Sequence, residues 1–426
     1  MLAIRGGQVI DAGGCRLSDV LLRGELIEAV GPGLDVPAGA RVLDAGGCVV
    51  APGLVDLHTH LRQPGREEAE CVETGARAAA LGGYTAVVAM PNTEPALDCA
   101  GAVRQVLDLG LSAMVDVSVA GAISVGRQGE CLAPMAEMAA LGVRIFTDDG
   151  DGVQDARLMR RAFEYSLPLG VTLAQHCEDS SLAAGSQMHE GEWSARLGLP
   201  GQPGLAEELM AWRDMALARL TGGRLHLLHL STAASMELVR AAKADGVAVT
   251  AEVTPHHLCL SDAAVAGYDA AFKVNPPLRE PSDVAALRGA LANGAIDAIA
   301  TDHAPHAPEA KEAPFDRAAP GMIGLETALG VILTELSSDL SLATILGLLS
   351  WQPASIAGLA AHGGPVAAGA VANLCVIDPA TTWTVDPAQG ASRSRNTPFA
   401  GKRLTGRLRH TVYRGEPVVI DAEPQR

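Results

Sequence analysis

Between residues 52 and 305 the chain alternates short apolar segments with helical stretches, and this alternation restricts its possible folds more than any other feature. The apolar segments have the length of buried strands. They lie at residues 53–58, 84–90, 113–119, 143–147, 171–176, 224–230, 247–253 and 296–301. Helical stretches lie at 67–82, 100–109, 132–140, 154–167, 205–220, 233–244, 281–292, 323–336 and 341–349. Eight strands with intervening helices over roughly 250 residues predict a (β/α)8 TIM barrel, an α/β fold.

Both ends of the chain instead have the texture of short strands separated by turns. The N-terminal strands are expected at residues 2–5, 9–11, 19–22, 25–30 and 41–44. The C-terminal strands are expected at residues 373–378, 383–385, 410–413 and 418–420. Neither end is long enough to bury a core alone. We therefore predict that residues 1–51 and 365–426 form one small β-sandwich, and that residues 52–364 form the catalytic barrel.

Charge and cysteine content exclude several classes of function. The 426 residues carry a formal net charge of −17, which argues against binding to nucleic acid or to an anionic membrane. The 8 cysteines show no CxxC spacing and are expected to be reduced thiols. We find no signal-peptide pattern and no apolar run of 18 residues, so we expect a cytoplasmic protein.

The first candidate site follows the first predicted barrel strand. His58 and His60 flank Thr59. Because side chains in a strand alternate between its two faces, both imidazoles point the same way and can converge on one metal ion. Arg62 continues on that face and would place a positive charge suited to a carboxylate beside the metal. A lone His-x-His also arises by chance, so the rest of the chain has to decide.

Other predicted barrel strands end in the same kinds of side chain. Active sites of such barrels form at the C-terminal ends of the strands. The residues found there are Asp149, His176, His229 and Asp302. This set predicts a divalent metal centre, with zinc preferred, bound through nitrogen and carboxylate oxygen with a position open to water.

Several neighbours of these residues have alternative interpretations. Asp148 could replace Asp149 as the ligand. His226 precedes His229 by three residues, faces the other side of its strand and is interpreted as a packed structural residue. His256 and His257 are expected to lie outside the direct ligand set. Cys177 is interpreted as a bystander thiol beside His176.

The motifs, taken in order, resemble the bacterial class I dihydroorotases of the amidohydrolase superfamily. The resemblance spans nearly the whole chain with motif order and spacing intact. It rests on Asp56–Arg62 with Pro64-Gly65, Ala89–Thr93, Phe146–Gly150, Ala174–Glu178, His226–Thr232, Glu252–Leu258, Ala300–His306 with Lys311, and Ser394–Phe399.

The resemblance implies a role for each matching residue. The metal shell would be His58, His60, Asp149, His176, His229 and Asp302. The substrate contacts would be His60, Arg62, Asn92, Asn275, His306 and the backbone of Pro320 and Gly321. Arg62, Asn92 and His306 would bind the substrate carboxylate, Asn275 would contact the ring, and Asp302 would also act as the catalytic acid and base.

One departure from the wider superfamily concerns the fourth strand. Many relatives bridge two metals there with a carboxylated lysine, but residues 142–146 read Gly-Val-Arg-Ile-Phe and contain no lysine. Asp149 is therefore expected to be the bridge, and the number of Zn²⁺ ions, one or two, stays open.

The implied reaction interconverts N-carbamoyl-L-aspartate and (S)-dihydroorotate in pyrimidine (UMP) biosynthesis. The resemblance also suggests a homo-oligomer and an association with aspartate transcarbamoylase. Two rivals remain at this point. A hydantoinase or allantoinase would need no carboxylate clamp, and a non-catalytic subunit would be expected to have lost the histidines that this chain keeps.

Overall fold

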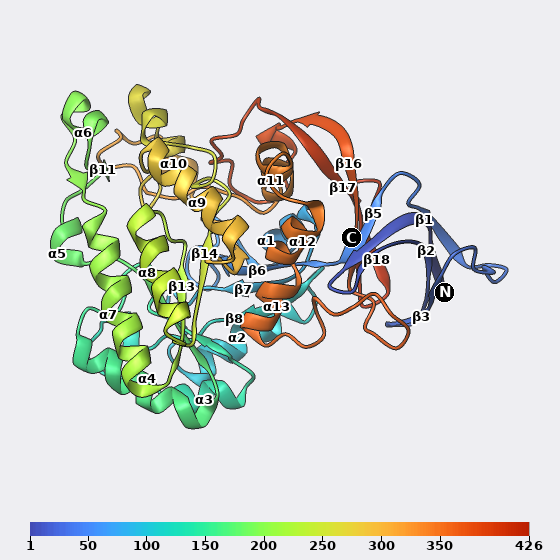
Figure 1. Ribbon diagram of the computed structural model, residues 1–426, viewed down its shortest axis with the longest axis horizontal. Helices are drawn as coiled ribbons and strands as arrows, with labels where there is room; N and C mark the ends of the chain where they lie inside the picture. Colours follow the sequence, from blue (N-terminus) through green and yellow to red (C-terminus); the bar gives the residue numbers. More distant parts are fainter. Residues whose placement is uncertain (426) are drawn as a thin grey trace.

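Eight parallel strands form a closed barrel in the computed structural model, which describes residues 1–425. The strands are β6 (Leu54–Thr59), β7 (Tyr84–Ala89), β8 (Asp116–Val119), β9 (Ile145–Phe146), β10 (Thr172–His176), β13 (Arg224–Leu228), β14 (Val249–Val253) and β15 (Ala298–Ile299). Three of them pair in the order β6-β7-β8 and five in the order β15-β14-β13-β10-β9. Parallel bridges between Gly121 and Phe146 and between Thr59 and His303 close the ring. The predicted TIM barrel is confirmed (Figure 1).

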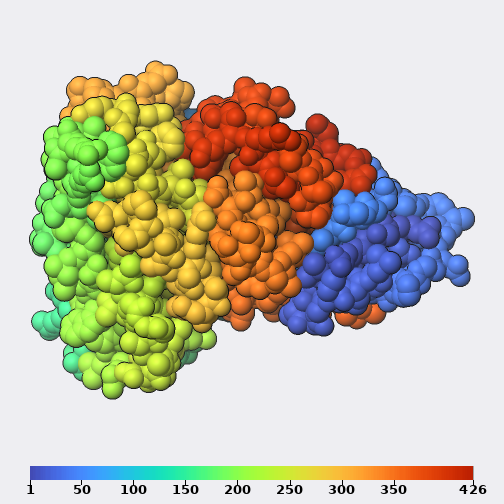
Figure 2. Space-filling model, turned by 45° about the horizontal axis from the view of Figure 1, so that its top comes forward, coloured from blue at the N-terminus to red at the C-terminus, as the bar shows by residue number. Residues whose placement is uncertain are grey.

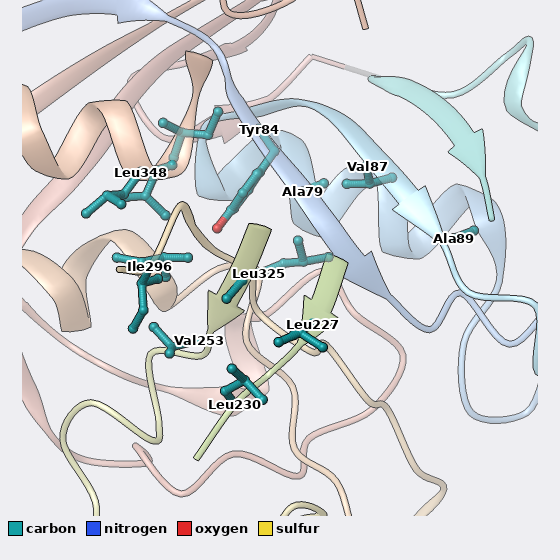
Figure 3. Close-up of a cluster of buried hydrophobic side chains, with 14 of the residues drawn as sticks. Ala79, Tyr84, Val87, Ala89, Leu227, Leu230, Val253, Ile296, Leu325 and Leu348 are labelled. Atoms are coloured by element: carbon teal, nitrogen blue, oxygen red, sulfur yellow. The ribbon is translucent and has the colours of Figure 1, made fainter. Parts of the chain in front are cut away.

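An outer layer of helices surrounds these strands (Figure 1). The helices are α1 (Val72–Gly82), α2 (Ala100–Gly110), α3 (Met135–Ala140), α4 (Ala156–Leu169), α7 (Leu205–Thr221), α8 (Ala233–Ala244), α9 (Pro281–Asn293), α11 (Ala328–Leu336), α12 (Leu342–Leu349) and α13 (Trp351–Ala357). The main core lies between strands and helices, where Tyr84 of β7, Leu227 of β13 and Leu348 of α12 belong to one buried cluster (Figure 3). A second, smaller cluster that includes Leu57 and Ala174 fills the barrel interior.

Short elements follow two of the strands. After β10 come α5 (Ser180–Ala183), β11 (Met188–His189), α6 (Glu192–Leu197) and β12 (Gly201–Gln202), and after β15 comes α10 (Pro308–Lys311). Short 3₁₀ helices lie at Val125–Arg127, Asp262–Gly267, Ala270–Phe272 and Pro387–Gln389. Because connections at the C-terminal ends of parallel strands build the active sites of barrels, the loops after β10 and β15 are the natural place for substrate contacts.

The two ends of the chain meet in one β-module (Figure 1). Its strands are β1 (Leu2–Asp11), β2 (Gly14–Arg23), β3 (Leu26–Gly31), β4 (Arg41–Asp44), β5 (Val49–Pro52), β16 (Leu374–Thr384), β17 (Arg403–Tyr413), β18 (Glu416–Ile420) and β19 (Glu423–Pro424). They pair in the order β19-β18-β17-β16-β5-β1-β2-β3, with β4 against β1. Its core contains Ile4 and Val50 from one end of the chain and Val376 from the other. The N-terminal part of this module projects from one side of the molecule (Figure 2).

The module differs from expectation in several details. At the C-terminal end, the strands expected at 373–378 and 383–385 are the single strand β16, β17 begins well before 410, and β19 was not expected. The separate strands expected at 2–5 and 9–11 are the single strand β1, whose register against β2 shifts between Ile4 and Gly7. Gly6 has a φ of 74°, which glycine adopts at no steric cost, so the chain bulges there and continues as a strand. The strand β5 was not expected, and it joins the two ends by pairing with both β1 and β16.

Some helix starts were also placed too early. Helices α1, α3 and α11 begin at Val72, Met135 and Ala328, later than expected, because the preceding residues form loops. Helix α13 was missed. Among residues 1–425, no helix combines the length and the apolar character needed to cross a membrane.

Candidate active site

Six histidine and aspartate side chains meet at the C-terminal ends of the barrel strands. His58 lies on β6 with His60 just beyond it, Asp149 follows β9, His176 ends β10, His229 follows β13 and Asp302 follows β15. All six are buried. His229 and Asp302 have positive φ angles of 32° and 47°, which are uncommon for residues other than glycine. Such backbone conformations concentrate at functional sites, where the surrounding structure holds them.

Asp149 lies in the middle of this cluster. Its Oδ1 is 3.4 Å from His58 Nε2, and 3.7 Å from both His176 Nδ1 and His229 Nε2. Its Oδ2 is 3.6 Å from His60 Nε2. The two carboxylate oxygens therefore face different groups of imidazoles, as the carboxylate of a bridging ligand would.

The second carboxylate, Asp302, completes the other side of the cluster. Its Oδ1 lies 2.9 Å from His60 Nε2 and 3.5 Å from His58 Nε2. The ligand atoms of His58, Asp149 and His229, and those of His58, His60 and Asp302, each lie within 4.8 Å of one another. His58 Nε2 and Asp149 Oδ1 are buried without a hydrogen-bond partner. Nitrogen and carboxylate ligands that converge in this way fit a divalent metal.

Both carboxylates stay ionised at neutral pH. Burial raises the pKa of the Asp302 carboxyl, but His58 and His60 more than offset that effect, and the net pKa lies below its ordinary range. Burial acts on Asp149 in the same direction, and His58, His176 and His229 bring its pKa well below the ordinary value. Ionised oxygens are the form that a metal ligand or a proton acceptor needs.

The imidazoles of His60 and His176 each contact predicted substrate residues or a neighbour of these residues. His60 Nδ1 is 2.9 Å from Asn92 Oδ1. His176 Nε2 lies 3.4 Å from Asn275 Nδ2 and 3.6 Å from a Glu178 oxygen. Asn275 Nδ2 donates to Glu178 Oε2 at 2.9 Å. Asn92, in the loop after β7, and Asn275, in the segment between β14 and α9, therefore border the cluster at different imidazoles.

Arg62 enters the same region as a buried cation. Its residue is 7% exposed, and its Nε donates to the Pro305 carbonyl at 3.1 Å. No carboxylate among residues 1–425 forms an ion pair with it. Burial lowers the pKa of Arg62 to about 10 despite the nearby Asp302. A buried guanidinium without a counter-ion is costly, and a bound anion would relieve that cost.

His306 and Gly321 form the wall of the site after β15. His306 Nε2 is 2.8 Å from the Pro320 carbonyl oxygen. Burial, Arg62 and Lys311 lower the pKa of His306 to about 3, so its ring is neutral. Gly321 has a φ of 135°, and a Cβ there would lie 2.8 Å from His306 Nε2, so only glycine fits.

The residues weighed as alternatives lie elsewhere. Asp148 faces away from the histidines, because its Oδ1 accepts from the backbone N–H groups of Ile123 and Ser124 at 2.8 and 3.0 Å. His257 contacts Thr254 Oγ1 at 2.8 Å and the Pro276 carbonyl at 3.0 Å.

Three further residues that were weighed have the following surroundings. His256 is buried, and its Nε2 has no hydrogen-bond partner. The buried Cys177 thiol points to the Gln175 carbonyl, and burial raises its pKa well above the ordinary value. Arg144 lies in the fourth-strand segment that lacks a lysine. Its guanidinium donates hydrogen bonds to the carbonyls of Ala139 and Val143.

Two carboxylates next to the cluster received no role from the sequence. Glu178 is held by Gln202 Nε2 at 2.9 Å as well as by Asn275. Glu252 of β14 lies 2.9 Å from His58 Nδ1 and 3.0 Å from His226 Nε2. His226 therefore makes a polar contact to the cluster in addition to its packing. A glutamate within an otherwise apolar barrel strand was the available signal, because glutamate is almost never fully buried unless paired.

A closed eight-stranded barrel with buried histidines and aspartates at its strand ends defines an amidohydrolase. Solved structures support this class. The chain is similar to the L-hydantoinase (dihydropyrimidinase) from Arthrobacter aurescens, with a TM-score of 0.89, 25% identity and coverage of 100% of this chain and 97% of that chain. It is similar in fold to the dihydropyrimidinase from Brevibacillus agri NCHU1002, with a TM-score of 0.87, 24% identity and coverage of 99% and 96%.

Sequence comparisons define the family more narrowly. The family model described as dihydro-orotase-like matches residues 47–235. The dihydroorotase of Streptomyces coelicolor is 51% identical over 425 residues, covering 99% of this chain and 98% of that protein. The dihydroorotase of Mycobacterium tuberculosis is 50% identical over 410 residues, covering 95% of each. The chain belongs to the dihydroorotase family.

Proposed function

We propose that this chain interconverts N-carbamoyl-L-aspartate and (S)-dihydroorotate in de novo pyrimidine biosynthesis. The observation that carries the proposal is the buried Arg62, which has no ion-pair partner among the described residues and follows His60 by two positions. Dihydroorotate has a carboxylate next to its cyclic amide. An enzyme that acts on it needs one fixed cation beside its hydrolytic centre, because a guanidinium binds a carboxylate through two parallel hydrogen bonds.

The metal is proposed to be Zn²⁺, held by His58, His60, Asp149, His176, His229 and Asp302. The Asp149 oxygens face different imidazoles, which supports two ions with Asp149 between them. When bound, a divalent metal lowers the pKa of a water molecule and polarises the amide carbonyl of the substrate.

Asp302 is proposed to move the proton during ring opening. Water oxygen bonds to the ring carbonyl carbon, the ring C–N bond breaks, and one water proton must reach the leaving nitrogen. Asp302 is ionised and is held by His60 at 2.9 Å, so it can accept that proton and pass it on. The reverse steps close the ring of carbamoyl aspartate.

The substrate contacts are proposed as a clamp around the ring. Arg62, Asn92 and His306 would bind the carboxylate, and Asn275 would contact the ring beside His176. The Asn92 carbonyl oxygen is already used by His60, so its amide N–H groups are the part left for the substrate. The backbone of Pro320 and Gly321 would close the opposite side next to His306.

A hydantoinase or dihydropyrimidinase is the second candidate, because the similar solved structures carry those names. The two activities differ in the substrate carboxylate. Steady-state turnover of dihydroorotate, dihydrouracil and hydantoin by the zinc-loaded protein separates them. We expect dihydroorotate to be preferred by kcat/KM, and equal or better turnover of dihydrouracil would favour the hydantoinase.

The domain division and the assembly are also proposals. Pairing of β5 with β1 and β16 supports a β-module of residues 1–51 and 365–426 beside a barrel of residues 52–364.

Exposed Leu205, Leu209 and Trp212 follow one face of α7 and support a homo-oligomer, which sedimentation velocity would test. Association with aspartate transcarbamoylase rests on family resemblance alone. The unpaired cysteines suit a cytoplasmic location.

A further inference from the structure

Glu252 connects the metal cluster to a second layer of buried polar groups. Its side chain is fully buried on β14, and its two oxygens have different partners. Oε1 lies 2.9 Å from His58 Nδ1 and accepts from the His229 backbone N–H at 3.3 Å. Oε2 lies 3.0 Å from His226 Nε2. The other His226 nitrogen, Nδ1, is 2.8 Å from Thr250 Oγ1.

These contacts determine where the imidazole protons lie. An ionised carboxylate only accepts hydrogen bonds, so both imidazole nitrogens that face Glu252 must carry hydrogen. His58 then has a proton on Nδ1, and metal binding uses the lone pair of Nε2. That lone pair points toward Asp149 and Asp302, where Nε2 has no hydrogen-bond partner. His226 has its proton on Nε2 and accepts from the Thr250 hydroxyl at Nδ1.

We propose that Glu252, supported by His226, is a positioning residue that holds His58 in the tautomer able to bind metal. The proposal rests on the metal centre proposed above and goes beyond its ligands. It gives His226 a role in place of plain packing. Carboxylates behind ligating histidines commonly orient the ring and raise its basicity, and their loss typically weakens metal binding by about 10- to 100-fold.

Glu252 also secures a second ligand through the main chain. The His229 N–H that it accepts belongs to a residue with a φ of 32°, a conformation that needs support. One carboxylate thus fixes the ring of His58 on β6 and the backbone of His229 after β13. Its removal should disturb ligands from two strands at once.

The first test is the affinity of the metal-free protein for Zn²⁺, measured by competition with a chromogenic chelator. Glu252→Gln keeps the size of the side chain but can accept through only one atom. We expect its Zn²⁺ affinity to fall by about 10- to 100-fold. Asp116→Asn is the matched control, because the half-buried Asp116 forms a carboxylate–histidine contact with the buried His362 at 3.1 Å, away from the cluster. Its Zn²⁺ affinity should stay within about twofold of native.

The second test reads the tautomer itself. Nitrogen-15 NMR of histidine-labelled, zinc-free native protein should show the His58 proton on Nδ1, which a merely structural Glu252 would not require. His226→Gln keeps an N–H donor for Glu252 and should bind Zn²⁺ more tightly than His226→Leu.

Two results would overturn the proposal: the absence of a proton from His58 Nδ1 in the native protein, or Zn²⁺ affinity of Glu252→Gln within twofold of native. The NMR measurement decides even if Glu252→Gln does not fold. Neither measurement uses dihydroorotate. A native protein that fails to turn over dihydroorotate but shows these effects would refute the proposed function and leave this inference standing.

Discussion

Replacing Arg62 by methionine should weaken substrate binding and stabilise the free protein at the same time. Methionine keeps much of the apolar volume and removes the guanidinium. A charge-assisted bidentate contact with a carboxylate contributes on the order of 2–4 kcal/mol. Its loss should raise the KM for dihydroorotate by about 30- to 800-fold. Bound zinc should be unchanged, because Arg62 is outside the cluster of ligands.

The stability change follows from the same burial. Arg62 is almost fully buried, and its pKa falls from 12.5 to about 10. A base whose pKa is lowered in the folded state costs stability at every pH below that value, so the cost is present at pH 7. That decrease corresponds to an upper bound on the order of 3 kcal/mol. We therefore expect Arg62→Met to have a Tm equal to or above that of native protein.

Arg66→Met is the matched control. Arg66 lies four residues further on and forms an exposed ion pair with Glu94 at 3.0 Å. It should leave both the KM and the Tm close to native values. Steady-state kinetics with dihydroorotate and dihydrouracil, together with calorimetry, measure the whole set. A KM for dihydroorotate within threefold of native in Arg62→Met would refute the carboxylate clamp.

Three further changes have defined outcomes. Asp302→Asn should retain most of its zinc and lose roughly 10²–10⁴ in kcat, and activity within tenfold of native would assign the proton transfer to another group. Gly321→Ala should raise the KM for dihydroorotate, because its Cβ would lie 2.8 Å from His306 Nε2 at a φ of 135°, and an unchanged KM would argue against this wall of the site. Asp214 is fully buried beside Arg213, and burial raises its pKa from 3.8 to about 7. A raised acid contributes stability below pH 3.8 that is lost as the pH rises through about 7, so the Tm of native protein relative to Asp214→Asn should fall between pH 4 and pH 8; a constant difference would contradict the shift.

The barrel could be predicted because its strands are apolar and alternate with helical stretches. The candidate ligands could be located because they stand at the ends of those strands or shortly after them, as His176 and Asp302 do. Such patterns involve residues that are close together in the sequence, so they can be recognised without the structure. The strand β5 was missed because Val49–Pro52 is short and becomes a strand only by pairing with β1 and β16 from distant parts of the chain.

The choice between Asp148 and Asp149 shows the limit at the site. Adjacent residues share every sequence property, and only the backbone N–H groups of Ile123 and Ser124 turn Asp148 away from the histidines. Glu252 could not be assigned for a similar reason. Its partners His58 and His226 are 194 and 26 residues away, and the barrel alone brings them together.

The central proposal is that buried histidines and aspartates hold a metal for dihydroorotate hydrolysis. The most direct measurement is dihydroorotate turnover by chelator-treated protein before and after addition of Zn²⁺, with Asp149→Ala treated alongside. We expect the metal-depleted native protein to be inactive, Zn²⁺ to restore turnover, and Asp149→Ala to stay inactive with less bound zinc by elemental analysis. Full turnover by metal-depleted protein, or no turnover by native protein that carries zinc, would contradict the proposal.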